Sequence, residues 1–345
     1  MRMVEAMCKE ISLRKNEIKE PLDSIYLGGG TPSLLKPEAL ASLLDTIYKF
    51  HAIVENPEIT LEVNPDDVNK ELLKRYKQLG VNRLSIGIQT FNDDLLRYVN
   101  RQHSSGQSVR ALNDARLVGF QNINADIIYG IPGSSKNNLE NDLKKILSFK
   151  PEHISIYGFT LEEKTVFGKW AKSGNLPVLE EDTEAILYEY IINTLPLSGY
   201  DHYEISNFCL EGYESRHNSG YWSGQPYIGI GPGAHSYQED NRWWNISNNH
   251  RYMQSLQENM LPSIYEERKP HDSLNEYIFT SLRTKWGCDI KKINKIWKKD
   301  FMVINQNYIQ YLIEEKLAKL KEHHLILSNR GKLLADQIAA ELMVD

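Results

Sequence analysis

The 345-residue chain is predicted to be an α/β protein, with a partial (β/α) TIM-like barrel followed by a small, mainly helical C-terminal domain. Strand-like runs alternate with helical stretches through its first half, which is typical of a parallel sheet. Polar residues follow several successive runs, whereas a doubly wound sheet would concentrate them at one switch point. Near residue 190 the alternation stops, and from about residue 270 the pattern is helical.

The composition excludes several classes of protein. Hydrophobic residues make up 41% and charged residues 25% of the chain, which is ordinary for a globular protein. The net charge of −6 gives no basic field that would attract nucleic acid. No apolar run approaches the roughly 20 residues of a membrane span, and the charged first residues do not resemble a signal peptide. We expect a cytoplasmic protein without a nucleic-acid partner or a transmembrane segment, which leaves peripheral membrane contact open.

The chain begins in a helix and then repeats a strand–helix unit. Val4, Met7, Cys8 and Ile11 lie at i, i+3, i+4 and i+7, on one face of a helix. Five strand-like runs are fewer than the eight of a complete barrel, so we expect the barrel to be partial. The strand-like runs cover 24–27, 59–63, 83–88, 123–129 and 153–159, and the helical stretches between them cover 36–50, 69–79, 106–118 and 137–149.

The pattern divides the chain into three parts. Residues 1–190 form the barrel, and residues 191–265 form a connecting region of short, glycine-rich and aromatic segments that contains "HNSGYW". Residues 266–345 show three helices and then "LILSNRGKLLADQIAAEL", an order that resembles a winged-helix module. Such modules often bind DNA, but the acidic balance favours a structural role. The basic run "KKINKIWKKD" is typical of a solvated helix face.

Three glycines in "GGGTPS" directly follow the first strand-like run. The spacing fits neither a dinucleotide-binding fingerprint nor a phosphate-binding P-loop. Residues without side chains allow the backbone to approach a ligand closely, and the alternative is a tight turn between strand and helix.

Four polar residues accompany the later strand-like runs. Glu62 and Asp126 lie within largely apolar runs, where a buried carboxylate is costly unless it is hydrogen-bonded. Gln89 follows the third run, and Arg101 follows a helix-like stretch. Each residue alone has a structural explanation, but their order along the chain favours a ligand site.

These motifs resemble a family. "GGGTPS", "LEVNPD", "RLSIGIQTF", "VNRQHS" and "NADIIYGIPG" resemble, in order, the core of radical S-adenosylmethionine (SAM) proteins of the oxygen-independent coproporphyrinogen oxidase type. "RHNSGYW" followed by "YIGIGPGAHSY" resembles its heme-chaperone branch, and the resemblance covers nearly the whole chain. It implies a radical SAM barrel with SAM as cofactor. By motif position, the residues expected to contact SAM are Gly29, Gly30, Thr31, Glu62, Gln89, Arg101 and Asp126.

The resemblance also implies an iron–sulfur cluster whose ligands are missing from this chain. The family carries C-x3-C-x2-C, which ligates a [4Fe–4S] cluster, on a loop before its first helix. Cys8, Cys209 and Cys288 do not have that spacing, so we expect no cluster ligands here, and we expect Cys8 to be a small buried hydrophobe. We interpret the barrel as missing its first strand through a truncated or misassigned start, with a cluster-free relative as the alternative.

In the heme-chaperone branch, the histidine that matches His217 is implied to bind heme. A neutral imidazole is a suitable axial ligand for heme iron. The neighbouring Asn218 would fix the loop, while Tyr221 and Trp222 would cover the porphyrin. The residues alone would make His217 a loop histidine with structural hydrogen bonds, and His235 is a weaker second candidate.

The resulting prediction is a heme chaperone that binds heme and passes it to heme-accepting apo-proteins, with no residue assigned as catalytic. The first alternative is an oxygen-independent coproporphyrinogen III dehydrogenase, which would oxidatively decarboxylate two propionates. A regulatory or nucleic-acid-binding protein that uses the C-terminal module is an alternative of another class.

Overall fold

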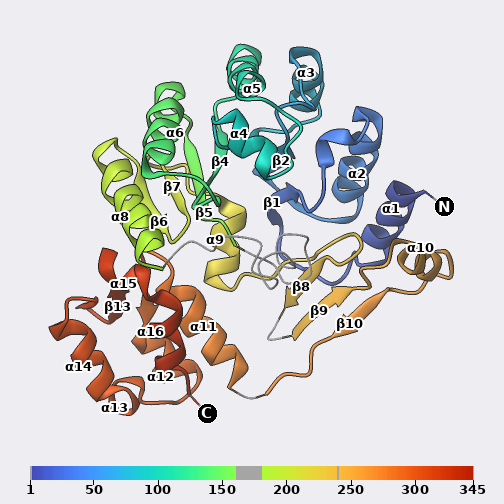
Figure 1. The fold of residues 1–345 in the computed structure, drawn as a ribbon. Helices are drawn as coiled ribbons and strands as arrows, with labels where there is room; N and C mark the ends of the chain where they lie inside the picture. Colours follow the sequence, from blue (N-terminus) through green and yellow to red (C-terminus); the bar gives the residue numbers. More distant parts are fainter. Residues whose placement is uncertain (1, 161–180, 239–240, 270, 345) are drawn as a thin grey trace, which may run out of the picture.

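A computed structural model describes residues 2–160, 181–238, 241–269 and 271–344. Its main sheet has seven strands in the order β1-β2-β3-β4-β5-β7-β6, curled into a half-barrel with helices around its outer side (Figure 1). Strands β1 to β5 run parallel, and β7 pairs antiparallel with both β5 and β6. The predicted partial (β/α) barrel is therefore confirmed. The strands are β1 Leu22–Leu27, β2 Ile53–Val63, β3 Arg83–Gln89, β4 Ile123–Tyr129, β5 His153–Gly158, β6 Asp201–Glu204 and β7 Asn207–Cys209.

Helices connect the consecutive parallel strands, and several of them begin with a local signal. Pro37 opens α2, and the side chain of Asn69 accepts a hydrogen bond from the first turn of α3. Ser104 and Ser135 form capping boxes that begin α5 and α6. The helices are α1 Met3–Leu13, η1 Pro32–Leu34, α2 Pro37–Phe50, α3 Lys70–Gln78, α4 Asp93–Tyr98, α5 Ser105–Val118, α6 Lys136–Phe149 and α8 Glu181–Leu197.

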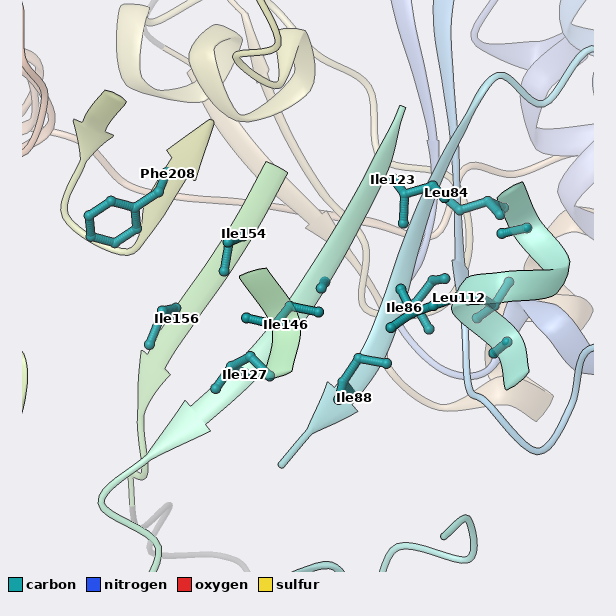
Figure 2. Packing of buried hydrophobic residues seen from close by; sticks show 14 of the residues in the cluster. Leu84, Ile86, Ile88, Leu112, Ile123, Ile127, Ile146, Ile154, Ile156 and Phe208 are labelled. Carbon is teal, nitrogen blue, oxygen red and sulfur yellow. The ribbon is translucent and has the colours of Figure 1, made fainter. Parts of the chain in front are cut away.

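Alternation along the strands separates an apolar outer face from a polar inner face. Figure 2 shows Leu84, Ile86 and Ile88 of β3 together with Leu112 of α5 and Ile146 of α6 in the buried core between sheet and helices. Successive side chains of a strand point to opposite faces, so the residues between these point into the half-barrel. Most residues of this inner face are polar, which is unusual for parallel strands and marks the place where a ligand site can form. They include Tyr26, Glu58, Glu62, Arg83, Ser85, Asn124, Asp126, His153, Ser155 and Tyr157.

A second, smaller sheet packs against the first helix (Figure 1). It has the antiparallel order β10-β9-β8, and α10 packs on α1 around Ala6, Tyr252 and Leu256. These elements are β8 His235–Gln238, β9 Asn241–Asn245, α10 Asn249–Gln257 and β10 Ser263–Tyr265.

A buried ion pair joins α1 to this sheet. Glu10 and Arg14 are both 0% exposed and lie 2.8 Å apart. Glu10 also accepts hydrogen bonds from the backbone N–H of Gly231 and from the side chain of Asn245, and Arg14 donates to Ser263. A buried charge requires such partners, so α1 fixes the loop before β8 in place.

The C-terminal module is mainly helical, as expected, and has its own core and a small antiparallel sheet of order β11-β13-β12. The boundary expected at residue 190 falls inside α8, and β6 and β7 extend the main sheet from the region expected to be a connection. None of the helices in the described ranges has the length and apolar character needed to cross a membrane. The module contains α11 Asp272–Leu282, β11 Cys288–Asp289, α12 Ile290–Ile296, α13 Phe301–Ile304, α14 Gln306–Glu314, β12 Ala318–Lys321, β13 His324–Leu327, α15 Asn329–Leu333 and α16 Ala335–Leu342.

Candidate functional site

The helix α9 (Arg216–Ser223), which carries "RHNSGYW", lies beside the inner side of the half-barrel (Figure 1). The buried Glu58 of β2 holds its first turn. Its carboxylate accepts hydrogen bonds from Ser215 Oγ at 3.4 Å and from the backbone N–H groups of Arg216 at 3.2 Å and His217 at 3.3 Å. A carboxylate is favoured at a helix N-terminus, where N–H groups lack partners within the helix. Glu58 therefore fixes the backbone of His217.

The imidazole of His217 lies between two tyrosines. Its ring stacks on Tyr26 of β1 with centroids 4.3 Å apart and meets Tyr221 edge-on at 4.6 Å. Burial and then the charge of Arg83 lower the pKa of His217 to about 4, so the ring is neutral at neutral pH. No hydrogen-bond partner for either ring nitrogen exists in the described part of the chain. A neutral imidazole with a free nitrogen can bind a metal centre.

His217 and Tyr221 face a cavity of about 980 Å³, which we call the outer cavity. It lies along β1, and α1 and α2 contribute Met7, Ile11 and Leu43 to its wall. β1 is an edge strand of the sheet as described. The remaining wall includes the glycine run and residues 225–230, and much of the lining is apolar. Such a cavity suits a large, mainly apolar ligand.

Of the other residues expected at the heme site, one shares the outer cavity and one does not. His235 lines it, but is exposed and packs 5.7 Å from the ring of Trp244. Trp222 faces the C-terminal module, where the guanidinium of Arg283 lies 5.9 Å from its ring centre. Trp222 is not part of the wall of the outer cavity, so the structure does not bring it together with Tyr221 there.

The glycine run lies at the junction of strand β1 and the outer cavity. A Cβ on Gly28 would lie 2.6 Å from Tyr26 Cε1 and 2.7 Å from Glu62 Oε1, so any side chain here would displace Tyr26 or Glu62. Gly29 has φ +76° and donates its N–H to Glu62 Oε2 at 3.2 Å. Glu62 Oε1 accepts from the Tyr26 hydroxyl at 2.8 Å. The expected ligand residues Gly29, Gly30 and Thr31 thus line the same cavity as the histidine.

A second cavity of about 150 Å³ lies deeper in the half-barrel and is almost entirely polar. Asp126 is half-buried there and accepts hydrogen bonds from Ser85 at 3.0 Å and Asn124 at 2.7 Å. Burial raises the pKa of Asp126 to about 6, against the opposing effect of these two hydrogen bonds. We call this space the inner cavity, and its walls are Tyr26, Glu62, Arg83, Ser85, Asn124, Asp126, Ser155, Tyr157 and Asn218.

Gln89 and Arg101 form a third group near the ends of β2 and β3. Gln89 has φ +65°, and its Nε2 would lie 2.9 Å from a Cβ on Gly87. Arg101 donates to Asn64 Oδ1 at 3.3 Å. Burial lowers the pKa of Arg101, while the charges of Asp126 and then Asp66 act in the opposite direction. The seven residues expected to contact SAM thus lie in three neighbouring groups, which Glu62 and Asp126 connect.

Sequence reasoning missed three residues that organise the site: Tyr26, Glu58 and Arg83. Tyr26 lines both cavities, Glu58 holds α9, and Arg83 lines the inner cavity. All three lie on the inner face of a strand. The signal that could have found them is the set of polar residues that alternate with the buried apolar residues of each strand.

The three cysteines do not form a cluster site. Cys8 is only half-buried on α1, in contrast to the buried residue expected, and its thiol contacts the carbonyl oxygen of Ser42 at 3.6 Å. Cys209 on β7 and Cys288 on β11 are buried, and burial raises the pKa of each thiol to about 12. Cluster ligation needs several convergent thiolates, so these residues do not fit a [4Fe–4S] cluster.

Comparisons with known proteins identify the family. Residues 5–146 match the radical SAM superfamily. The heme chaperone HemW of Lactococcus lactis is 35% identical over 94% of this chain and 86% of its own length, and that of Bacillus subtilis is 35% identical over 92% and 84%. The HemW of Mycobacterium tuberculosis is 31% identical over 99% of this chain and 86% of its own length.

A solved structure supports the fold. Coproporphyrinogen III oxidase (HemN) from Escherichia coli, described as a radical SAM enzyme, superposes with a TM-score of 0.83 over 99% of this chain and 82% of that chain, at 22% identity. Radical SAM proteins as a family use SAM and a [4Fe–4S] cluster, so the present cysteines depart from the family pattern. The family match and the HemW relatives, in agreement with the half-barrel fold, show that the chain belongs to the HemW family of radical SAM proteins.

Proposed function

We propose that the protein is a heme chaperone that binds heme in the outer cavity through His217 and passes it to heme-accepting proteins. The observation that carries this proposal is a neutral imidazole, free at its ring nitrogens within the described chain, on the wall of a cavity of about 980 Å³. Tyr26 and Tyr221 hold the ring, and the apolar wall excludes water that would compete for the iron. The name of the relatives supports the same function.

A second part of the proposal assigns SAM to the glycine run and its polar neighbours. Glu62 offers a carboxylate beside exposed backbone groups of Gly29 and Gly30, which suits an ammonium group and a close approach of the ligand. Arg101 and Asp126 supply one charge of each sign at the adjacent strand ends. When bound, SAM would bring a sulfonium and a zwitterionic amino-acid end. Because the cysteines do not fit the cluster, we propose no reaction that requires it.

The proposed partners are proteins that accept heme, and a transfer experiment tests the function. The chain is loaded with one equivalent of hemin, freed of excess, and mixed with apomyoglobin as a probe acceptor. We expect the absorption spectrum of the myoglobin complex to develop with a rate constant larger than that for spontaneous release of hemin from the chain. The release rate is measured in the same buffer without apomyoglobin. Stable one-to-one loading without any transfer would contradict a chaperone function, and failure to load would contradict heme binding itself.

A further inference from the structure

Arg83 is a buried cation whose guanidinium has no hydrogen-bond acceptor among the described residues. It is the first residue of β3, it is 2% exposed, and it lines the inner cavity. No residue in the described ranges forms a hydrogen bond or ion pair with its guanidinium, and its Nε atom is buried without an acceptor. A guanidinium has five N–H donors, and burying them without acceptors is costly. The charge of Arg83 acts on the nearby Asp126, but the two side chains form no direct hydrogen bond.

The principal acceptors in the wall of the inner cavity already have donors of their own. The two oxygens of Asp126 accept from Ser85 at 3.0 Å and from Asn124 at 2.7 Å. The two oxygens of Glu62 accept from the Tyr26 hydroxyl at 2.8 Å and from the glycine run at 3.2 Å. These oxygens keep further acceptor sites, but within the described chain none of them accepts a hydrogen bond from Arg83, so the guanidinium keeps unused N–H donors in the wall of the inner cavity.

We infer that the inner cavity binds a carboxylate group, with the guanidinium of Arg83 as its ion-pair partner. Two carboxylate oxygens match two parallel N–H donors of a guanidinium. The cavity volume of about 150 Å³ is sufficient for such a group. A doubly charged anion would be repelled more strongly by Glu62 and Asp126, so the singly charged carboxylate is favoured over phosphate.

Two sources could supply this carboxylate. Tyr26 lines both cavities, and consecutive residues of α9 line different ones, His217 the outer cavity and Asn218 the inner cavity. The charge of Arg83 also acts on the imidazole of His217, which indicates that the two sites are close. A propionate arm of a porphyrin in the outer cavity is one source, and it rests on the proposed function. The carboxylate of a separate molecule is the other source, and this includes the amino-acid end of SAM, which the proposed function places beside Glu62 and Asp126.

The experiment compares the wild-type chain with Arg83→Gln and Arg83→Lys. Arg110→Gln is the matched control, since it removes one positive charge from the exposed side of α5. In the first arm, each protein is titrated with hemin and with hemin dimethyl ester, which lacks free carboxylates. In the second arm, the melting temperature is measured with sodium propionate and with sodium chloride at equal ionic strength.

We expect wild type and Arg110→Gln to bind hemin about 10-fold or more tightly than the ester, and Arg83→Gln to bind both equally. Arg83→Lys keeps the positive charge but cannot form a bidentate hydrogen bond, so it should retain part of the preference for hemin over the ester. It also provides a test if Arg83→Gln does not fold. A second outcome is that propionate raises the melting temperature of the wild type but not of the Arg83 variants, while hemin and its ester bind equally well. This outcome would mean that the inner cavity binds a free carboxylate and not a porphyrin propionate.

The results also separate this inference from the proposed function. If wild type binds no hemin, heme binding is refuted, and the propionate arm alone decides the inference. If hemin and its ester bind alike to wild type and propionate has no specific effect, the inference is overturned and the inner cavity holds only water.

Discussion

The contact between Glu58 and α9 predicts how the heme site is held in place. The change Glu58→Gln removes a negative charge that faces the first turn of α9, while a carbonyl oxygen remains to accept a hydrogen bond. A charge at a partly buried helix N-terminus contributes up to about 2 kcal/mol, and the three hydrogen bonds here are long, at 3.2 to 3.4 Å. We therefore expect a loss of about 1–2 kcal/mol, or roughly 5- to 30-fold in the local equilibrium that holds α9.

The assay measures hemin affinity and the free energy of unfolding in the same preparations. Glu55→Gln is the matched control, because Glu55 lies on the same strand but is exposed. Glu58→Gln should weaken hemin binding about 5-fold or more, because the backbone of His217 loses its anchor, whereas Glu55→Gln should change neither quantity. Equal hemin affinity in Glu58→Gln and the control would refute the positioning role.

Three further outcomes follow from the same site. Burial lowers the pKa of His217 to about 4, so hemin affinity should change by less than about 2-fold between pH 7.5 and 5.5. A histidine of ordinary pKa would become protonated in this range and lose roughly 10-fold in affinity for the iron. Hemin titrations at several pH values in this range test the prediction. Gly28→Ala should destabilise the fold by about 1–3 kcal/mol in chemical denaturation, since its Cβ would strike Tyr26 and Glu62, and Gly30→Ala should not, since its Cβ meets open space. Anaerobic reconstitution should yield far fewer than the roughly four irons per chain of a [4Fe–4S] cluster, and a full complement by iron and sulfide analysis would show other ligands.

The half-barrel could be predicted because its signals are local. Each of the five parallel strands overlaps a run of β-forming residues, and prolines, asparagines and serines begin the helices between them. The sequence places β6 and β7 in a connecting region, because both strands are short and carry no clear pattern. Their place in the sheet depends on pairing with β5, which is distant in the sequence.

The site was predictable only where a motif marks it. His217 and the glycine run belong to recognisable motifs, and both line the outer cavity. Glu58 and Arg83 look like ordinary charged residues near strand ends, because their roles depend on α9 and on the curvature of the sheet. The interaction between Glu58 and His217 spans 159 positions, and no local pattern encodes it.

The central claim is that His217 is the protein ligand of heme iron in the outer cavity. Its most direct test is the optical and electron paramagnetic resonance spectrum of the hemin complex in wild type, His217→Ala and the neighbouring control His235→Ala, with circular dichroism to confirm folding. The account predicts that only His217→Ala loses the histidine-ligated spectrum and binds hemin at least 10-fold more weakly. An unchanged Soret band and affinity in a folded His217→Ala protein would contradict it.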